Sequence, residues 1–587
     1  MEKDVVKKRV ICSTVSILWT IAVSSYISTS DIVVIGGLIL FFAFLVLSMQ
    51  DNLYFRILSP NKKDIVIAVF FSLLLLVGKL IYIEHYLTSL FGHPFYNLVI
   101  FIGTAHFLAV FIPYIVETLY SFFSESLPEI ELGKKHLIAF IVIVSALDII
   151  AFLTYYPGVA AYDYGPSYCQ ATGESPLNNQ QPILYTLIWK AIFLVAGNFH
   201  DRFMGNVIYS LVQIIVVNIT FCYVLIWLKK KKVSSMLILF SGLYYMINPT
   251  FWLYSFETTK DVYFGCILIV FLTSFYDLIT TKKRVFTCFI SCLLACFLRN
   301  NMIYAMIVLC IVVFFIVPSK VKKLELASVL PALLISILVP AFLYPAMKIE
   351  YTDSAEFLSI PIQQISALYA HDGYFNEEEK EILKQYLPRI EDYNYRFADP
   401  VKNYMDNDLY DKDKAPFWKI YFKGLKCNPH IYLSAALDTN VQLWYPASTA
   451  NDQFAQRDYV EIELYPSDEA VGHYTHGIFD RIRPYFKEAA TLHNTFSTLP
   501  LVRNYLSLSF PFFSLAFCLI IMIRMGKKYE TVIPIALLLL EATYMLGPVS
   551  NYRYLYPMYI MLPVYFSMTV RKATDTDIVE GSMSTGA

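Results

Sequence analysis

The stretch VFTCFISCLLACFLRNNMIYAMIVLCIVVFFIV, residues 285–317, decides the fold of this chain. It is strongly apolar on both sides of a central polar triplet, Arg299-Asn300-Asn301. A bilayer core about 30 Å thick needs roughly 20 apolar residues per helix. One helix through the whole run would bury the triplet in the membrane, where a charged side chain is costly. The triplet therefore predicts a turn between two short helices, which together cross the membrane twice.

The composition of the whole chain indicates the same class of protein. Of its 587 residues, 57% are hydrophobic and only 16% are charged, against about 25% charged in ordinary globular proteins. The net charge is −1, so no overall field attracts nucleic acid. These values exclude a disordered chain, a small disulfide-rich domain and a basic nucleic-acid binder. We expect an all-α polytopic membrane protein.

Further apolar runs predict membrane-spanning helices along most of the chain. They lie near residues 10–28, 32–49, 64–83, 96–120, 137–155, 203–228, 233–252, 262–280, 324–345, 505–524, 531–547 and 553–570. Residues 183–197 are also apolar, but a helix of this length is only about 22 Å long and too short to cross.

Positive charges predict which side of the membrane each loop occupies, because short loops rich in Lys and Arg stay in the cytoplasm. All eight basic clusters fall on one side only if 183–197 does not cross and 285–317 crosses twice. This gives about 14 membrane helices, with both termini cytoplasmic, in the plasma membrane. The clusters are Lys7-Lys8-Arg9, Lys62-Lys63, Lys134-Lys135, Lys229 to Lys232, Lys282-Lys283-Arg284, Lys320 to Lys323, Lys527-Lys528 and Arg571-Lys572.

The outer side then receives two polar segments, residues 156–202 and 346–504. The second carries 24 Asp and Glu against 16 Lys and Arg and is expected to fold as a mainly helical or mixed soluble domain before the last three spans. The predicted organisation is an N-terminal four-helix extension (1–136), a membrane core (137–345), the extracytoplasmic domain (346–504), C-terminal membrane helices (505–572) and a disordered cytoplasmic tail (573–587).

The first outer loop holds the leading catalytic candidate. Pro157-Gly158 ends the preceding helix, and Asp163 follows between Tyr162 and Tyr164. A carboxylate at the membrane surface, beside an apolar helix that does not cross, suits chemistry on a lipid head group. The alternative for a single loop Asp is that it only caps a turn.

Several short motifs in this order resemble the GT-C superfamily of membrane glycosyltransferases, especially bacterial envelope members and their Gram-positive relatives. The resemblance covers residues 137–570. It rests on YPG and YD within 156–163, QQP at 180–182, KD at 260–261, RNN at 299–301, IPIQQISALYAHDG at 360–373 and NYRYLYP at 551–557.

The resemblance implies a GT-C-like fold and assigns Asp163 as the catalytic base. It implies a polyprenyl-phosphate-sugar donor and an envelope glycopolymer, glycolipid or protein as acceptor, with transfer outside the plasma membrane. Gln181-Pro182 stands where the family usually has an HP-like dipeptide, so a His-based role is not carried over. A single displacement predicts inversion at the sugar carbon.

The lipid phosphate that leaves needs Arg or Lys donors. We expect these to be Arg299, Lys260 and Arg553, each of which alternatively caps a helix end. Glu257 and Asp261 flank Lys260 and alternatively only pair with it. Gln181, Gln363, Gln364 and His371 are further candidates for contact with donor or acceptor. The sequence implies no definite cofactor. Asp163 and Glu257 could share a divalent metal, whereas phosphate binding by Arg and Lys side chains would make a metal unnecessary.

Two other functions are alternatives to a glycosyltransferase. A transporter or flippase of lipid-linked glycans would place its charges near the bilayer midplane, often in two related halves. A glycan polymerase or ligase would also act outside. No GxxxxGK[ST] motif is present, so ATP-driven transport by this chain is not expected.

Overall fold

The computed structural model describes residues 2–26, 32–125, 133–159, 164–197, 202–316, 319–371, 373, 375–446, 479–485 and 507–571. Within these ranges the regular structure is helical, and β pairing is confined to three isolated bridges. The helical class predicted from the sequence is therefore confirmed. By length and composition, six helices in the described ranges suffice to cross a membrane: Lys62–Glu84, Pro94–Phe123, Lys134–Thr154, Phe203–Lys230, Lys260–Thr281 and Lys322–Ala346.

The run at 285–317 forms two helices, as its central triplet predicts. α13 spans Val285–Leu298 and α14 spans Met302–Ile316. Arg299 between them has an extended backbone, with φ −148° and ψ 109°. The short apolar run after Pro182 is likewise a separate helix, α8 (Ile183–Ala196).

The chain divides into two compact units, each built from two stretches that are distant in the sequence. The first unit combines residues 1–125 with 357–449, and the second combines 126–356 with 450–587. The predicted extracytoplasmic segment 346–504 is thus shared between the units. The helices of the first unit are α1 (Glu2–Ser24), α2 (Ile32–Ser48), α3 (Asp51–Leu58), α4 (Lys62–Glu84), α5 (Pro94–Glu125), α17 (Ser359–Ala370), α18 (Glu377–Tyr386), α19 (Asp399–Lys402), α20 (Asn407–Lys412), α21 (Ala415–Cys427) and α22 (Pro429–Trp444), with the 3₁₀ turns η1 (Leu87–Phe91) and η4 (Ile390–Asp392).

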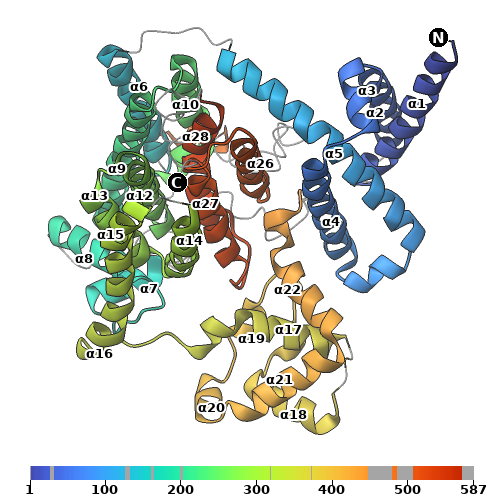
Figure 1. Ribbon diagram of the computed structural model, residues 1–587. Helices are drawn as coiled ribbons and strands as arrows, with labels where there is room; N and C mark the ends of the chain where they lie inside the picture. The colour runs from blue at the N-terminus through green and yellow to red at the C-terminus, as the bar shows by residue number, and fades with distance from the viewer. Residues whose placement is uncertain are drawn as a thin grey trace. The chain divides into compact units, whose positions relative to one another are not determined.

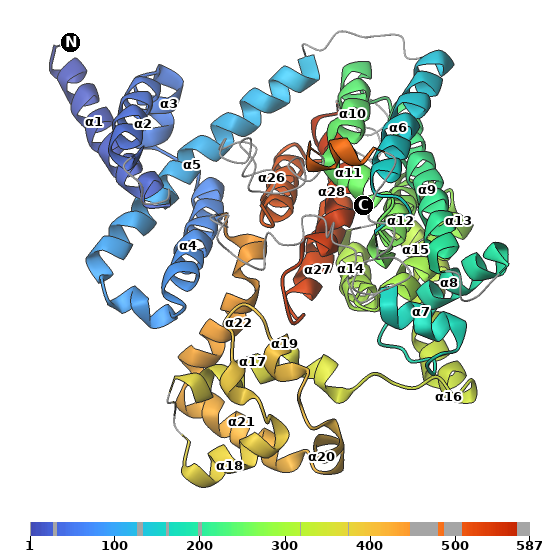
Figure 2. The same cartoon turned by 180° about the vertical axis from the view of Figure 1, so that it is seen from behind.

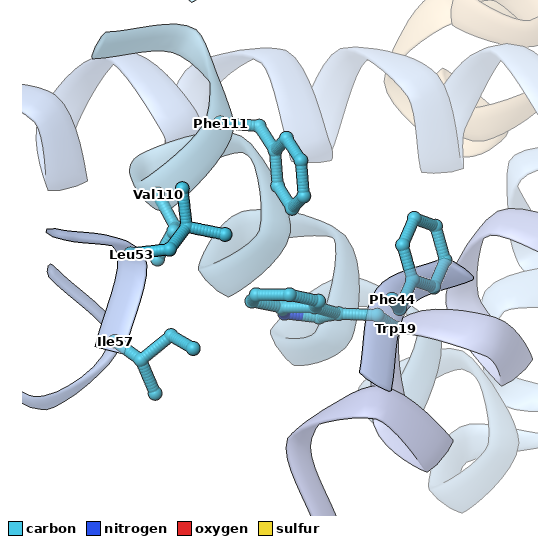
Figure 3. Packing of buried hydrophobic residues seen from close by; sticks show 6 residues of the cluster. All are labelled: Trp19, Phe44, Leu53, Ile57, Val110 and Phe111. Carbon is cyan, nitrogen blue, oxygen red and sulfur yellow. The ribbon is translucent and has the colours of Figure 1, made fainter. Parts of the chain in front are cut away.

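An aromatic cluster holds the N-terminal helices of the first unit together. The Trp19 ring of α1 is fully buried, with its centroid 5.2 Å from that of Phe111 and 5.8 Å from that of Phe44 (Figure 3). Its indole N–H donates to His106 Nδ1 at 3.0 Å. A buried Trp needs such a partner for its polar atom. Both buried apolar surface and this hydrogen bond therefore hold α1 against α5.

The polar helices α17 to α22 form a small bundle in which α17 packs against α22 (Figure 2). α22 also contacts α4, and Gly78 permits their close approach. A Cβ on Gly78 would lie 2.6 Å from Cδ2 of Tyr445 and 2.9 Å from Cζ3 of Trp444. The N-terminal helices and this bundle therefore share one packed unit.

In the second unit, α12 is the central helix. It contacts α9, α13, α15 and α28 (Figure 1), and most of its residues are buried. The remaining helices are α6 (Lys134–Thr154), α7 (Tyr164–Thr172), α8, α9 (Arg202–Lys230), α10 (Ser235–Ile247), α11 (Pro249–Tyr254), α12 (Lys260–Thr281), α13, α14, α15 (Ser319–Leu338), α16 (Tyr344–Ala346), α26 (Phe510–Arg524), α27 (Val532–Tyr544) and α28 (Tyr556–Val570), with short turns η2 (Val339–Leu343), η3 (Ser354–Leu358), η5 (Asp480–Ile482) and η7 (Tyr552–Leu555).

Candidate functional site

The candidate site of the second unit is built around the segment that leads into α12. Thr259 caps this helix, since its side chain accepts a hydrogen bond from the Asp261 backbone N–H. Glu257, Thr258 and Asp261 are all buried. Buried polar groups require hydrogen-bond partners, and the neighbouring helices supply them.

Three side chains from α8 and α9 hold the backbone of this segment. Tyr185 donates its hydroxyl to the Thr258 carbonyl at 2.9 Å. Tyr209 donates to the Thr259 carbonyl at 3.2 Å, and Gln213 Nε2 donates to the Glu257 carbonyl at 2.7 Å. The carbonyls are thus fixed before α12 begins, which gives the segment a defined shape.

The first predicted outer loop begins against the same segment. Val159 forms an isolated parallel bridge with Glu257. The Thr258 N–H donates to the Val159 carbonyl at 2.9 Å. Asp163, the predicted base, lies outside the described residues. The chain is described again from Tyr164, which packs on Trp189 of α8 with a centroid distance of 5.1 Å.

Lys260 contacts the same loop again, just before α8. Its Nζ donates a hydrogen bond to Oε1 of Gln181, 79 residues earlier in the chain. Two sequence candidates, one from each of two predicted outer loops, are therefore in direct contact.

Asp261 forms a buried ion pair with Arg299 at the turn between α13 and α14. The Asp261 side chain is fully buried and that of Arg299 is 8% exposed. Because both groups have left water, each depends on the other to offset its lost hydration. The pair therefore connects the start of α12 to the turn that follows α13.

The ring of Tyr554 links Arg299 to Arg553. The guanidinium carbon of Arg299 lies 4.4 Å from the ring centroid of Tyr544 and 4.7 Å from that of Tyr554. The guanidinium of Arg553 lies 5.3 Å from the Tyr554 centroid. Within about 6 Å such contacts are attractive, so one ring lies close to both arginines.

The three predicted phosphate ligands are thus linked in two ways: Arg299 and Arg553 share the Tyr554 ring, and Lys260 directly precedes Asp261, the ion-pair partner of Arg299. Gln181 contacts Lys260, and Glu257 lies three residues before Lys260. No group of three or more His, Cys, Asp or Glu residues that would bind a metal comes together in the described part of the chain. The available chemistry is that of cationic donors beside a few carboxylates.

The remaining candidates lie in the first unit, where they stabilise the helical bundle. Gln363 donates to the Asn394 carbonyl at 2.6 Å, and Gln364 donates to the Tyr432 carbonyl at 3.1 Å. His371 packs edge-on against Tyr86, with a centroid distance of 4.8 Å. These residues therefore belong to a different unit from Asp261.

Sequence reasoning missed the residues that shape the site. Tyr185, Tyr209 and Gln213 donate hydrogen bonds to backbone carbonyls of the segment before α12. The ring of Tyr544 contacts the guanidinium of Arg299. Asn, Tyr and Gln at 206, 209 and 213 do share one face of an otherwise apolar helix. Such polar positions within a membrane helix were the available signal.

Comparison with known proteins adds a family. Residues 167–581, more than two thirds of the chain, match the model of a family described as "Family of unknown function (DUF6020)". No curated protein and no solved structure gave a significant match.

Proposed function

The chain belongs to the DUF6020 family of unknown function, and we propose that it is an inverting membrane glycosyltransferase of GT-C type. It transfers a sugar from a polyprenyl-phosphate-sugar donor to an envelope glycopolymer, glycolipid or protein outside the plasma membrane. One observation carries the proposal. Arg299 and Arg553, from separate segments, flank the Tyr554 ring. Lys260 immediately precedes Asp261, the ion-pair partner of Arg299, in the segment that contacts Val159 at the start of the loop that holds Asp163.

Contacts between predicted outer segments support the proposed topology of 14 crossings. Apart from the contacts at Glu257 and Asp261, the Glu350 N–H donates to the Leu177 carbonyl at 2.8 Å. The Thr352 N–H donates to Asn179 Oδ1 at 2.7 Å. Each contact joins two segments that the positive-inside rule assigns to the outer side.

Contacts between predicted cytoplasmic segments support it equally. Lys231 and Arg284 both pair with Asp277 at the end of α12. Arg571 pairs with Glu530 at 3.0 Å and donates to the Lys231 carbonyl. α12 thus carries predicted outer contacts at its start and predicted cytoplasmic contacts at its end, as a spanning helix requires.

The packing of α8 supports its not crossing. Trp189 stacks on Tyr209 with a centroid distance of 4.5 Å, and Phe193 packs against Gly205. α8 therefore runs back along the first turns of α9. At 1.5 Å per residue α9 is about 43 Å long, so it can span a core of about 30 Å and extend beyond it alongside α8.

The chemistry proceeds by one displacement. An acceptor hydroxyl attacks the anomeric carbon of the donor sugar while the carboxylate of Asp163 takes the hydroxyl proton. The bond from that carbon to the phosphate oxygen breaks, and the lipid phosphate leaves with the bonding electrons. Arg553, Lys260 and Arg299 stabilise its charge. Asp261 fixes Arg299, whose Nε has no hydrogen-bond partner among the described residues.

Transfer by purified protein tests this function. The full chain in nanodiscs receives a radiolabelled polyprenyl-phosphate sugar and a membrane extract as acceptor, without an energy source. Radioactivity should move from the lipid carrier to the acceptor. A transporter or flippase would leave the label on its carrier, and a polymerase or ligase would transfer a preassembled glycan but not a single sugar. Either result would overturn the proposal.

A further inference from the structure

A small cavity of about 210 Å³ lies within the first unit, between the end of α4 and helices α17 and α22. Its polar and aromatic lining residues are His85, Tyr86, His371, Tyr393, Tyr395 and Ser434. Three small or aliphatic side chains complete the wall. Tyr395 is 40% exposed and His371 is also exposed, so the cavity is accessible from solvent.

Two of the ring pairs that line the cavity meet at steep angles, while His85 and Tyr395 lie 3.9 Å apart with planes at 40°. Tyr86 and His371 are 4.8 Å apart with planes at 76°, and His371 and Tyr393 are 6.1 Å apart with planes at 84°. Edge-on packing of this kind is favourable. The same rings line the cavity, so an occupant would contact aromatic side chains.

Hydrogen bonds fix the wall in place. Nδ1 of His85 lies 2.8 Å from Oδ2 of Asp438. Asp438 also pairs with Arg396, whose side chain is 5% exposed and donates to the Tyr82 carbonyl at 3.1 Å. The Leu87 N–H donates to the Ser434 hydroxyl at 3.0 Å. The end of α4 is therefore anchored to α22 on both sides of Tyr86.

The charges around the cavity balance. The carboxylate of Asp438 is offset by the guanidinium of Arg396. Burial raises the pKa of Tyr393 and of Tyr86 above the ordinary value, so both phenols remain neutral hydrogen-bonding groups at physiological pH. A neutral ligand with several hydroxyl groups matches such a wall better than a phosphate or a carboxylate.

We propose that this cavity binds one neutral sugar ring of the acceptor glycan. The assignment to a glycan acceptor rests on the proposed function. The cavity would hold about seven waters at roughly 30 Å³ each, which is room for one pyranose and not for a longer oligosaccharide. Aromatic rings cover the apolar C–H faces of a sugar, while His, Tyr and Ser side chains bind its hydroxyls, the usual division of labour in a small-molecule site.

This assignment also gives the N-terminal helices a role. The family match begins at residue 167, so His85 and Tyr86 lie outside it. His371, Tyr393, Tyr395 and Ser434 lie within it. Helix α4 therefore completes a pocket whose other residues come from the matched part of the chain, and this chain's extension would adjust which acceptor sugar binds.

Saturation-transfer difference NMR on the full chain in nanodiscs tests the site without any donor. The probes are methyl glycosides of neutral hexoses and N-acetylhexosamines, with choline chloride as a cationic comparison. At least one glycoside should bind saturably. Tyr86→Ala should weaken its binding by about tenfold, since it removes one aromatic wall. Tyr404→Ala removes a tyrosine of the same unit that is 49% exposed and stacks on Arg389 outside the cavity, and it should leave binding unchanged.

A second variant covers the case in which Tyr86→Ala does not fold. Ala435→Leu keeps every ring and places a larger side chain in the cavity wall, so it should abolish glycoside binding. Absence of binding by the wild type, unchanged binding in both variants, or saturation by choline alone would overturn the proposal. The site and the proposed function can be rejected separately. If the wild type binds a glycoside, both variants bind it more weakly and no sugar transfer occurs, the site is retained and the enzyme function is rejected. If sugar transfer occurs but the variants do not alter glycoside binding, only the site is rejected.

Discussion

Arg299 forms a buried ion pair with Asp261, 38 residues away in the chain. The partners come from the turn after α13 and from the first turn of α12. Arg299 also contacts the ring of Tyr554, which lies beside Arg553. The pair therefore fixes the side chain of Arg299, while Arg553 is positioned by a separate segment. This arrangement predicts different consequences for the two arginines.

Arg299→Ala should destabilise the protein, because it leaves the Asp261 carboxylate buried without its partner. The expected loss is about 3–5 kcal/mol, and removing Asp261 as well should restore part of it. Thermal unfolding in detergent measures both variants. Arg389→Ala is the matched control, since its pair with Asp392 at 3.9 Å is exposed and should contribute at most about 1 kcal/mol. Equal losses in the two single variants would contradict the prediction.

Arg553→Ala should weaken donor binding by about 1.5–3 kcal/mol, the contribution of a hydrogen bond to a charged group. Arg553→Lys should recover only part of this, because a point charge cannot reproduce the guanidinium fork. Equilibrium binding of a fluorescent polyprenyl-phosphate sugar measures the effect. Unchanged affinity in the Ala variant would leave Arg553 as a helix-end anchor.

Asp163→Asn should lower turnover by about 10²–10⁴-fold, the range of general base catalysis. Asn preserves the size of the side chain but cannot take a proton at neutral pH, so donor binding should stay nearly constant. Initial rates of sugar transfer at saturating donor give the answer. If the Asn variant keeps more than about a tenth of the wild-type rate, the base is another residue, and Glu257→Gln and Asp261→Asn are tested next.

Cysteine labelling from outside the cell tests the topology. In a background without the ten native cysteines, probes at Ser175 and Glu378 should react with a membrane-impermeant maleimide. A probe at Lys230 should react only after permeabilisation, because it lies in a predicted cytoplasmic cluster. Labelling of the Lys230 probe in intact cells would invert the topology and remove Asp163 from the outer side.

Gly78→Ala should destabilise the first unit despite the higher helix propensity of Ala. Its new Cβ would lie 2.6 Å from Tyr445, and overpacking of this kind costs about 1–3 kcal/mol. Gly242→Ala is the control, since the nearest atom to its Cβ is 3.6 Å away in ordinary contact. The control should be neutral or gain up to about 1 kcal/mol from propensity. Thermal unfolding of the two variants distinguishes them.

The sequence by itself determined the helical class and where most helices lie. Long apolar runs leave a backbone in the membrane only one way to satisfy its polar groups within the run, so each run predicts a helix. The triplet at Arg299 likewise predicted the division into α13 and α14. Local polar signals act outside the membrane too: α18 begins with a capping box formed by Asn376 and Glu379.

Only the tertiary structure decided which side chains meet. The sequence singled out Asp261, Arg299 and Arg553 separately, but their shared contacts depend on how α12, α13 and the turn before α28 pack. No sequence pattern indicated that His85 and Asp438, 353 residues apart, lie in one packed unit. The physical reason is range: helix formation depends on neighbours within one or two turns, whereas a buried ion pair or a pocket wall depends on three-dimensional packing that no local pattern encodes.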